Sequence, residues 1–214
     1  MGFHMIDMDT WERREHYHYY RNIIKTRYNL NAEIDITNLL KQVKEKELRF
    51  YPVFVYILIR AVNDTKELRM SLDSDGHLGY WDLCHPSYTI FHDDDKTFSD
   101  IWTEYSEDFS VFYKRAVSDM EMYKNVKGIK AKPDTPPNFC PISCVPWLTF
   151  TGYGSDTYAE SNMFYPVILF GKYHESDGRF LLPLGISVNH AVADGYHTCS
   201  FFQKVQSEAS LITL

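Results

Sequence analysis

An apolar run near the C-terminus, residues 179–188, constrains the fold more than any other stretch of this 214-residue chain. Its leucine, isoleucine and valine residues predict a buried strand that leads into a His-x-x-x-Asp-Gly motif at residues 190–195. Gly195 offers the backbone freedom for a sharp turn into a helix, which we expect over residues 197–209. His190 is therefore placed where a strand gives way to a loop, and catalytic side chains often lie on such connections.

A lone histidine on an apolar element is more often a core residue than a catalytic one, and its spacing to an aspartate could arise by chance. Two further motifs, far apart in the chain, favour the functional interpretation. They are Trp11-Glu12-Arg13-Arg14-Glu15-His16 and Ile142-Ser143-Cys144-Val145-Pro146-Trp147.

Together the three motifs resemble the chloramphenicol acetyltransferase family, trimeric enzymes that move an acetyl group from acetyl-CoA to a hydroxyl of the drug. The resemblance spans nearly the whole chain and implies a two-layer α/β sandwich with a mixed β-sheet. It also implies a homotrimer whose active sites lie between neighbouring subunits. Further matching stretches are Phe50-Tyr51-Pro52-Val53, Glu67-Leu68-Arg69-Met70, Tyr88-Thr89-Ile90-Phe91-His92, Thr97-Phe98-Ser99 and Gly171-Lys172-Tyr173.

The remaining elements follow an α/β order without a linker, so we expect a single domain over residues 1–214. Residues 28–36 alternate as a half-buried strand does, and Thr37 is the expected cap of the next helix. The apolar run 53–62 predicts a core helix opened by Pro52 and is too short for a bilayer. Also expected are a hairpin at 73–76, strands at 88–92, 97–103, 142–150 and 167–173, a helix at 108–123 and a loop at 130–137.

Composition limits the partners and the compartment. A formal net charge of −7 without a lysine-rich patch argues against a nucleic-acid partner. The N-terminus has no export signal or lipid-anchor motif, and no membrane span is expected. The four cysteines lack a C-x-x-C pair, which favours reduced thiols in the cytoplasm over a zinc site or a disulfide framework. These are Cys84, Cys140, Cys144 and Cys199.

Acyl transfer from a thioester to an alcohol needs a base for the hydroxyl proton and a donor for the developing oxyanion, and it needs no metal. We expect His190 to be the base, with one ring nitrogen accepting the proton while a fixed acceptor holds the other. The resemblance implies that Ser143 stabilises the oxyanion; its more ordinary role would be a hydrogen bond to nearby backbone. The resemblance also implies that Asp194 forms a structural ion pair with Arg13 and does not complete a catalytic triad.

For the coenzyme, the resemblance assigns Trp147 and Tyr173 to the walls of a coenzyme A channel, and Arg49 and Lys172 to its phosphates. Core or interface aromatics and solvated surface cations are equally good interpretations of these four residues.

For the acceptor, the resemblance implies a pocket lined by Tyr19, Tyr20 and Phe98. Most departures from the family pattern also fall around this pocket, so chloramphenicol is the leading acceptor and another small alcohol is the alternative. The departures are Asn189 for a histidine, Pro141 for an asparagine, Leu169 for a threonine, Met163 for a tyrosine and Asp100 for a small residue.

Other classes of function have weaker support. The run His92-Asp93-Asp94-Asp95 and the pair His16 and His18 could bind a metal, but a solvated turn and a helix with a two-residue spacing explain them better. No nucleophile elbow, P-loop or dinucleotide motif is present. A degenerate family member that binds without turnover is disfavoured because both His190 and Ser143 are retained.

Overall fold

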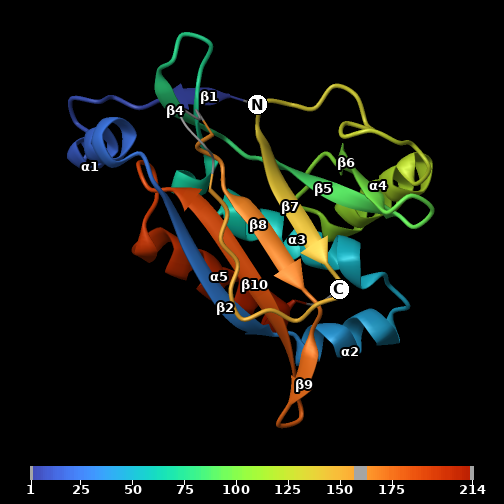
Figure 1. Cartoon of the computed structure of the whole chain (residues 1–214). Coiled ribbons are helices and arrows are strands. Elements are labelled where there is room, and N and C mark those ends of the chain that lie inside the picture. The colour runs from blue at the N-terminus through green and yellow to red at the C-terminus, as the bar shows by residue number, and fades with distance from the viewer. Residues whose placement is uncertain (1, 157–162, 213–214) are drawn as a thin grey trace.

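The computed structural model of the chain describes residues 2–156 and 163–212. Its main sheet has the strand order β2-β10-β8-β7-β5-β6, with β9 paired to β10 (Figure 1). β7 runs parallel to both β5 and β8, while the other pairs are antiparallel, so the predicted mixed sheet is confirmed. The strands are β2 (Arg27–Asp35), β5 (His85–His92), β6 (Thr97–Trp102), β7 (Phe139–Val145), β8 (Val167–Gly171), β9 (His174–Ser176) and β10 (Arg179–Asn189).

Helices cover one face of this sheet and lie behind it in Figure 1, which gives the expected two-layer α/β arrangement. The helix α3 (Phe50–Asn63) is apolar on all sides, and every side chain from residue 52 to 59 is buried, as in a core helix. None of the described helices is long and apolar enough to cross a membrane. The others are α1 (Arg14–His18), the π-helix η1 (Tyr19–Ile24), α2 (Thr37–Glu45), the 3-10 helix η2 (Lys66–Arg69), α4 (Phe109–Tyr123) and α5 (Gly195–Leu211).

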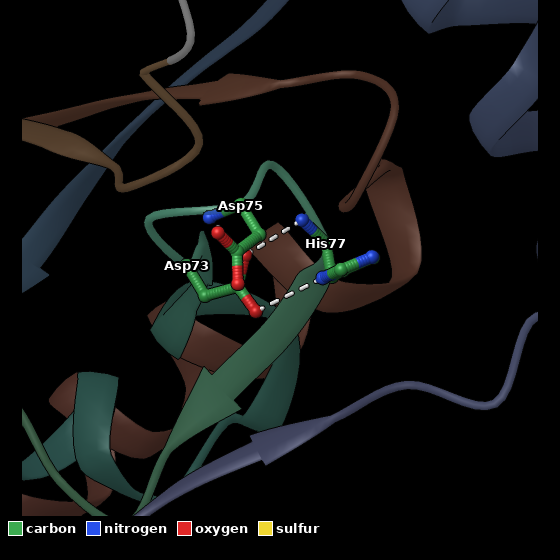
Figure 2. Close-up of side chains that lie close together, drawn as sticks. All are labelled: Asp73, Asp75 and His77. Atoms are coloured by element: carbon green, nitrogen blue, oxygen red, sulfur yellow. Dashed lines mark hydrogen bonds and ion pairs between the residues drawn. The ribbon is translucent and has the colours of Figure 1, made fainter.

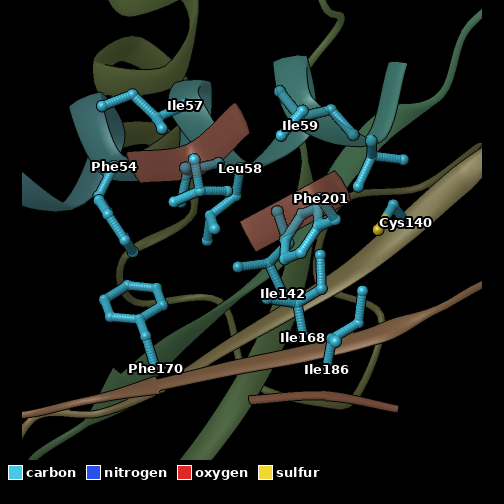
Figure 3. Packing of buried hydrophobic residues seen from close by; sticks show 14 of the residues in the cluster. Phe54, Ile57, Leu58, Ile59, Cys140, Ile142, Ile168, Phe170, Ile186 and Phe201 are labelled. Carbon is cyan, nitrogen blue, oxygen red and sulfur yellow. The ribbon is translucent and has the colours of Figure 1, made fainter. Parts of the chain in front are cut away.

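A row of three isoleucines anchors the sheet to the helices. Ile186 of β10 pairs with Ile168 of β8, and Ile168 pairs with Ile142 of β7. All three are at most 1% exposed and face Leu58 of α3 and Phe201 of α5 (Figure 3). Burying one such side chain contributes about 1.5–3 kcal/mol, so this row holds β7, β8 and β10 in a fixed register.

A second, three-stranded sheet contains β1 (Phe3–Met5), β4 (Leu78–Trp81) and β3 (Met70–Leu72), in the order β1-β4-β3. The hairpin predicted at residues 73–76 joins β3 to β4 and is confirmed. Gly76 in its turn has a φ of 84°, a conformation that favours glycine.

The start of α5 differs from the prediction. The helix begins at Gly195, two residues early, because the Asp194 carboxylate accepts a hydrogen bond from the Tyr196 N–H at 3.1 Å and caps it. The predicted conformational role of Gly195 is wrong, since its φ is not positive. A Cβ atom at this position would lie 3.4 Å from the Tyr28 hydroxyl, which is an ordinary van der Waals contact.

Two further boundaries need correction. β7 spans Phe139–Val145, whereas the expected strand ran from 142 to 150; Pro146 lacks an N–H group and follows its last residue. Thr37 is not the cap of α2, because the capping position is Ile36. The N–H and hydroxyl of Thr37 both donate to the Asp35 carboxylate, at 3.0 and 2.6 Å.

Candidate active site

His190 follows the last residue of β10 and is held by backbone hydrogen bonds. Its N–H donates to the carbonyl of Thr26, the residue before β2, at 3.1 Å. Asn189 closes a tight turn around it, because its side-chain oxygen accepts from the Ala191 N–H at 3.0 Å and its carbonyl accepts from Val192 at 3.1 Å. These contacts fix the backbone from which the imidazole projects.

The His190 ring lies against two tyrosine rings. Tyr20 of η1 stacks on it with a centroid distance of 3.8 Å and an interplanar angle of 13°. Tyr28 of β2 lies at 5.5 Å and is tilted by 49°. The buried Nδ1 has no hydrogen-bond partner in any other described residue, so the fixed acceptor expected for it is not among them. Stacking on Tyr20 sets the plane of the ring instead.

Arg13 and Asp194 form an ion pair beside this loop. Arg13 Nη1 donates to Asp194 Oδ2 at 2.5 Å, and the two side chains are only 16% and 29% exposed. His197 Nδ1 lies 2.9 Å from the other carboxylate oxygen and 3.2 Å from the Asp194 amide nitrogen. His197 Nδ1 can donate a hydrogen bond to the Asp194 carboxylate or accept one from the Asp194 amide, but not both at once. Asp194 therefore joins the N-terminal segment to the loop that carries His190.

We expect Arg13 and Asp194 to be energetically coupled. Arg13→Ala and Asp194→Ala should each lower the free energy of unfolding by about 1–3 kcal/mol, because each leaves a partly buried charge without its partner. The double variant should lose less than the sum, with a coupling of about 0.5–3 kcal/mol measured by urea denaturation. Additive losses would contradict the pairing.

The same pair predicts a pH dependence of stability. Burial acts to raise the pKa of Asp194, but the hydrogen bond and charge of Arg13 outweigh it and hold the pKa below its usual value. The stabilisation is then complete above the unfolded-state pKa of about 3.9 and is lost as the pH falls through the folded-state pKa. The stability difference between wild type and Asp194→Asn should be constant near neutral pH and shrink below about pH 4. A difference that stays constant down to pH 2 would contradict this.

Ser143 lies on the face of the sheet opposite the helices, since its neighbour Ile142 points into the core. Leu169 of β8 pairs with Ser143, and Gly185 of β10 pairs with Leu169. The Ser143 hydroxyl makes no hydrogen bond within the described part of the chain. Ser143 therefore makes no hydrogen bond to nearby described backbone, which would have been its more ordinary role. Its hydroxyl is available to a ligand.

Ser143 and His190 do not meet within one chain. Ser143 lies one residue beyond the isoleucine row at Ile142, and His190 lies four residues beyond Ile186 in the opposite direction, because β10 is antiparallel to β8. Five residues correspond to about 17 Å along the strands, and two strand spacings to about 10 Å across them. One chain therefore separates the two groups by roughly 15–20 Å.

A cavity of about 450 Å³ lies at the C-terminal ends of β7 and β8 and contains three of the four predicted coenzyme residues. Trp147, Lys172 and Tyr173 line it, and the Lys172 ammonium forms no ion pair with a described carboxylate. Arg49 does not line the cavity; its guanidinium pairs with Glu121 of α4 at 2.7 Å.

The cavity wall also includes residues that were not predicted to line the coenzyme site. They are mainly apolar and include Phe50, Tyr51, Phe91 and Cys144. Burial raises the pKa of the Cys144 thiol to about 12, so the thiol stays neutral and behaves as an apolar group. The signal that could have found Phe50 and Tyr51 is the stretch at 50–53, which matches the family pattern.

The predicted acceptor residues fall into two groups. Tyr20 stacks on His190, and Tyr19, 46% exposed, packs edge-on against Tyr20 with centroids 5.1 Å apart. Phe98 lies on β6, at the other end of the sheet, where it pairs with Phe91 and is 49% exposed. The acceptor residues are thus divided between the His190 side and the Ser143 side of the chain.

The geometry at residues 92–95 does not support the metal interpretation. His92 is buried and bonded to Ser99 Oγ at 2.7 Å, away from the following aspartates, which face lysines. A different group, Asp73, Asp75 and His77, gathers in the β3–β4 turn (Figure 2). There the Asp73 carboxylate accepts hydrogen bonds from the Asp75 and His77 N–H groups at 2.9 and 2.8 Å, so it stabilises the turn.

Comparisons with known proteins identify the family of this chain. The family model described as chloramphenicol acetyltransferase matches residues 1–206. The chain belongs to the chloramphenicol acetyltransferase family. A chloramphenicol acetyltransferase from Clostridium perfringens is 41% identical over 98% of this chain and 96% of its own length. Another, from Vibrio anguillarum, is 37% identical over 96% and 94%.

A solved chloramphenicol acetyltransferase shares the fold, with a TM-score of 0.84 over 96% of this chain and 99% of that one, at 23% identity. In this chloramphenicol acetyltransferase family member, Arg13, Ser143, His190 and Asp194 all lie within the matched range of residues 1–206.

Proposed function

We propose that this chain transfers the acetyl group of acetyl-CoA to a hydroxyl of chloramphenicol and so inactivates the antibiotic. The observation that carries the proposal is membership of the family over residues 1–206, together with relatives of that name along nearly the full length. The free Ser143 hydroxyl and the stacked His190 ring supply the two groups that the reaction requires.

In the proposed reaction the His190 imidazole removes the proton from the acceptor hydroxyl as its oxygen attacks the thioester carbonyl. The carbonyl oxygen becomes negative in the tetrahedral intermediate, and Ser143 Oγ donates a hydrogen bond to it. When the intermediate collapses, the carbon–sulfur bond breaks and the imidazolium returns the proton to the departing thiolate. The acetyl group passes directly between the substrates, so Ser143 forms no covalent intermediate.

A shared site follows from the separation of Ser143 and His190. Because one chain keeps them roughly 15–20 Å apart, the proposed site joins Ser143 of one chain to His190 of a neighbour. A closed ring of chains would contain one such site for each chain. The resemblance to trimeric enzymes supports three chains, and on that ground we propose a homotrimer.

The cavity beside Trp147 is the proposed coenzyme site. Its apolar wall suits the pantetheine arm, and Lys172 is the cation proposed for a phosphate. Arg49 would have to break its ion pair with Glu121 before it could bind a coenzyme phosphate.

The proposed co-substrate, acetyl-CoA, and the four free cysteines favour a cytoplasmic enzyme.

Trp147→Ala tests the coenzyme assignment. The Trp147 ring is 63% exposed and packs on Phe91 with centroids 4.6 Å apart, so it is free to stack on a ligand. Its loss should raise the KM for acetyl-CoA about tenfold and leave the KM for chloramphenicol nearly unchanged. Trp147→Phe, which keeps a ring, should recover most of the affinity. Equal rises in both KM values would contradict the assignment.

The proposed function is tested by following thiol release from acetyl-CoA with the purified protein, with and without chloramphenicol. The expected result is acceptor-dependent release and a singly acetylated product by mass spectrometry. A second candidate, acetylation of a different small alcohol, is favoured by the apolar Leu169 beside Ser143. Release with another alcohol and none with chloramphenicol would support that candidate and overturn the first.

A further inference from the structure

Arg27 is a buried cation close to the catalytic loop. It is the first residue of β2, is 8% exposed, and pairs with Asn189, the residue before His190. The residue before it, Thr26, accepts the hydrogen bond from the His190 N–H. A buried guanidinium is costly unless its donors are satisfied, so its partners indicate what it does at this position.

The Arg27 guanidinium binds Ser187 of β10 in two places. Nε donates to Ser187 Oγ at 2.8 Å, and Nη2 donates to the Ser187 carbonyl at 2.8 Å. The Ser187 hydroxyl in turn donates to the carbonyl of Ser155, also at 2.8 Å. The arginine is thereby fixed to β10 three residues before His190, and the serine extends the network to residue 155.

Arg27 also reaches the segment that enters β8. Nη1 donates to the carbonyl of Met163 and Nη2 to that of Tyr165, both at 3.4 Å. Asn189 Nδ2 donates to the same Met163 carbonyl at 3.3 Å. Burial lowers the pKa of Arg27 below its usual value, and the charge of Asp156 offsets only part of this. The usual pKa of arginine is so high that the guanidinium remains charged.

These contacts tie residues 155, 163 and 165 to the strand that ends at His190. Met163 is one of the positions at which this chain departs from the family pattern around the acceptor. The planar fork of five N–H donors is what allows one side chain to hold Ser187 and two carbonyls at once, and a lysine ammonium cannot reproduce that geometry.

We propose that Arg27, through Ser187, is a positioning residue that sets the acceptor side of the site by holding residues 155 and 163–165 against the end of β10. The proposal rests on the proposed function for its substrate, but the contacts that carry it do not depend on which alcohol is acetylated. Arg27 touches no reacting atom; it acts through the backbone of Met163 and Tyr165 and through the Ser187 hydroxyl.

Arg27→Lys tests the proposal, with Ser187→Ala as a milder variant that removes one hydroxyl and is expected to fold. Arg27→Lys should raise the KM for chloramphenicol at least about tenfold, while the KM for acetyl-CoA stays within about twofold. Ser187→Ala should shift the acceptor KM in the same direction by a smaller factor. Arg69→Lys is the matched control, since Arg69 donates to the backbone carbonyls of Trp81, the last residue of β4, and of Asp82, which follows it.

The control should lose thermal stability without changing either KM. A purely structural Arg27 would behave like Arg69, with a lower melting temperature and an unchanged acceptor KM, and that result would overturn the proposal. An equal rise in both KM values would overturn it as well.

A second readout needs no acceptor. Amide hydrogen exchange of residues 153–156 and 163–165 should be faster in Arg27→Lys than in wild type and unaffected in Arg69→Lys. Unchanged exchange would overturn the proposed contacts even if the wild-type enzyme proved active. A wild-type protein that is silent with chloramphenicol would refute the proposed function, and hydrogen exchange would still decide the role of Arg27.

Discussion

His190→Ala is expected to lower kcat for acetyl transfer by at least about 10²- to 10⁴-fold, because the variant lacks the base proposed to remove the acceptor proton. The KM values for both substrates should change little, since the imidazole acts mainly in the transition state. Thiol release from acetyl-CoA in the presence of chloramphenicol measures both quantities.

The control for this variant is Tyr20→Phe, which keeps the ring that stacks on His190 and removes only a hydroxyl. It should retain a much larger fraction of kcat than His190→Ala, because ring stacking is preserved. If His190→Ala kept more than about one tenth of wild-type kcat, another group would have to be the base.

Ser143→Ala is expected to lower kcat by about 10²- to 10³-fold, the usual cost of removing one oxyanion donor. Substrate binding should be nearly unaffected, because the oxygen accepts its strongest hydrogen bond only when it is negative. Steady-state kinetics with both substrates varied would separate the two effects.

Ser143→Thr and Ser143→Cys provide the comparison for this variant. The threonine keeps a hydroxyl and should retain more activity than the alanine, whereas the thiol is a weak donor and should resemble the alanine. A cysteine variant with near wild-type kcat would point to a nucleophile instead of an oxyanion donor, and a trapped acetylated residue would then be detectable by mass spectrometry.

The sequence was a good guide to the elements whose side-chain pattern is regular. The buried helix over 53–62 and the strand ending at His190 were predictable because each is a nearly continuous apolar run, which marks a buried element. Helix boundaries that depend on a single polar contact were not predictable. The Asp194 carboxylate starts α5 at Gly195, and the Asp35 carboxylate accepts from the first amide of α2, that of Thr37.

The candidate site was predictable as a set of residues but not as an arrangement. Ser143 and His190 carry motifs, yet their separation of roughly 15–20 Å depends on the order and register of β7, β8 and β10, which one sequence does not encode locally. Arg27 carried no signal either, because a lone arginine at the start of a strand normally faces solvent. Only its burial and its contacts with Ser187 distinguish it.

The central claim, that each site combines Ser143 of one chain with His190 of another, is tested most directly by mixing two inactive variants. Equal amounts of His190→Ala and Ser143→Ala chains are dissociated and reassembled, and activity is compared with either variant alone. Random mixing makes three trimers in four mixed, and each mixed trimer has one intact site in three, so about one quarter of wild-type activity should return. Mixed trimers that form and stay as inactive as the single variants would place both residues in one chain and contradict the shared site.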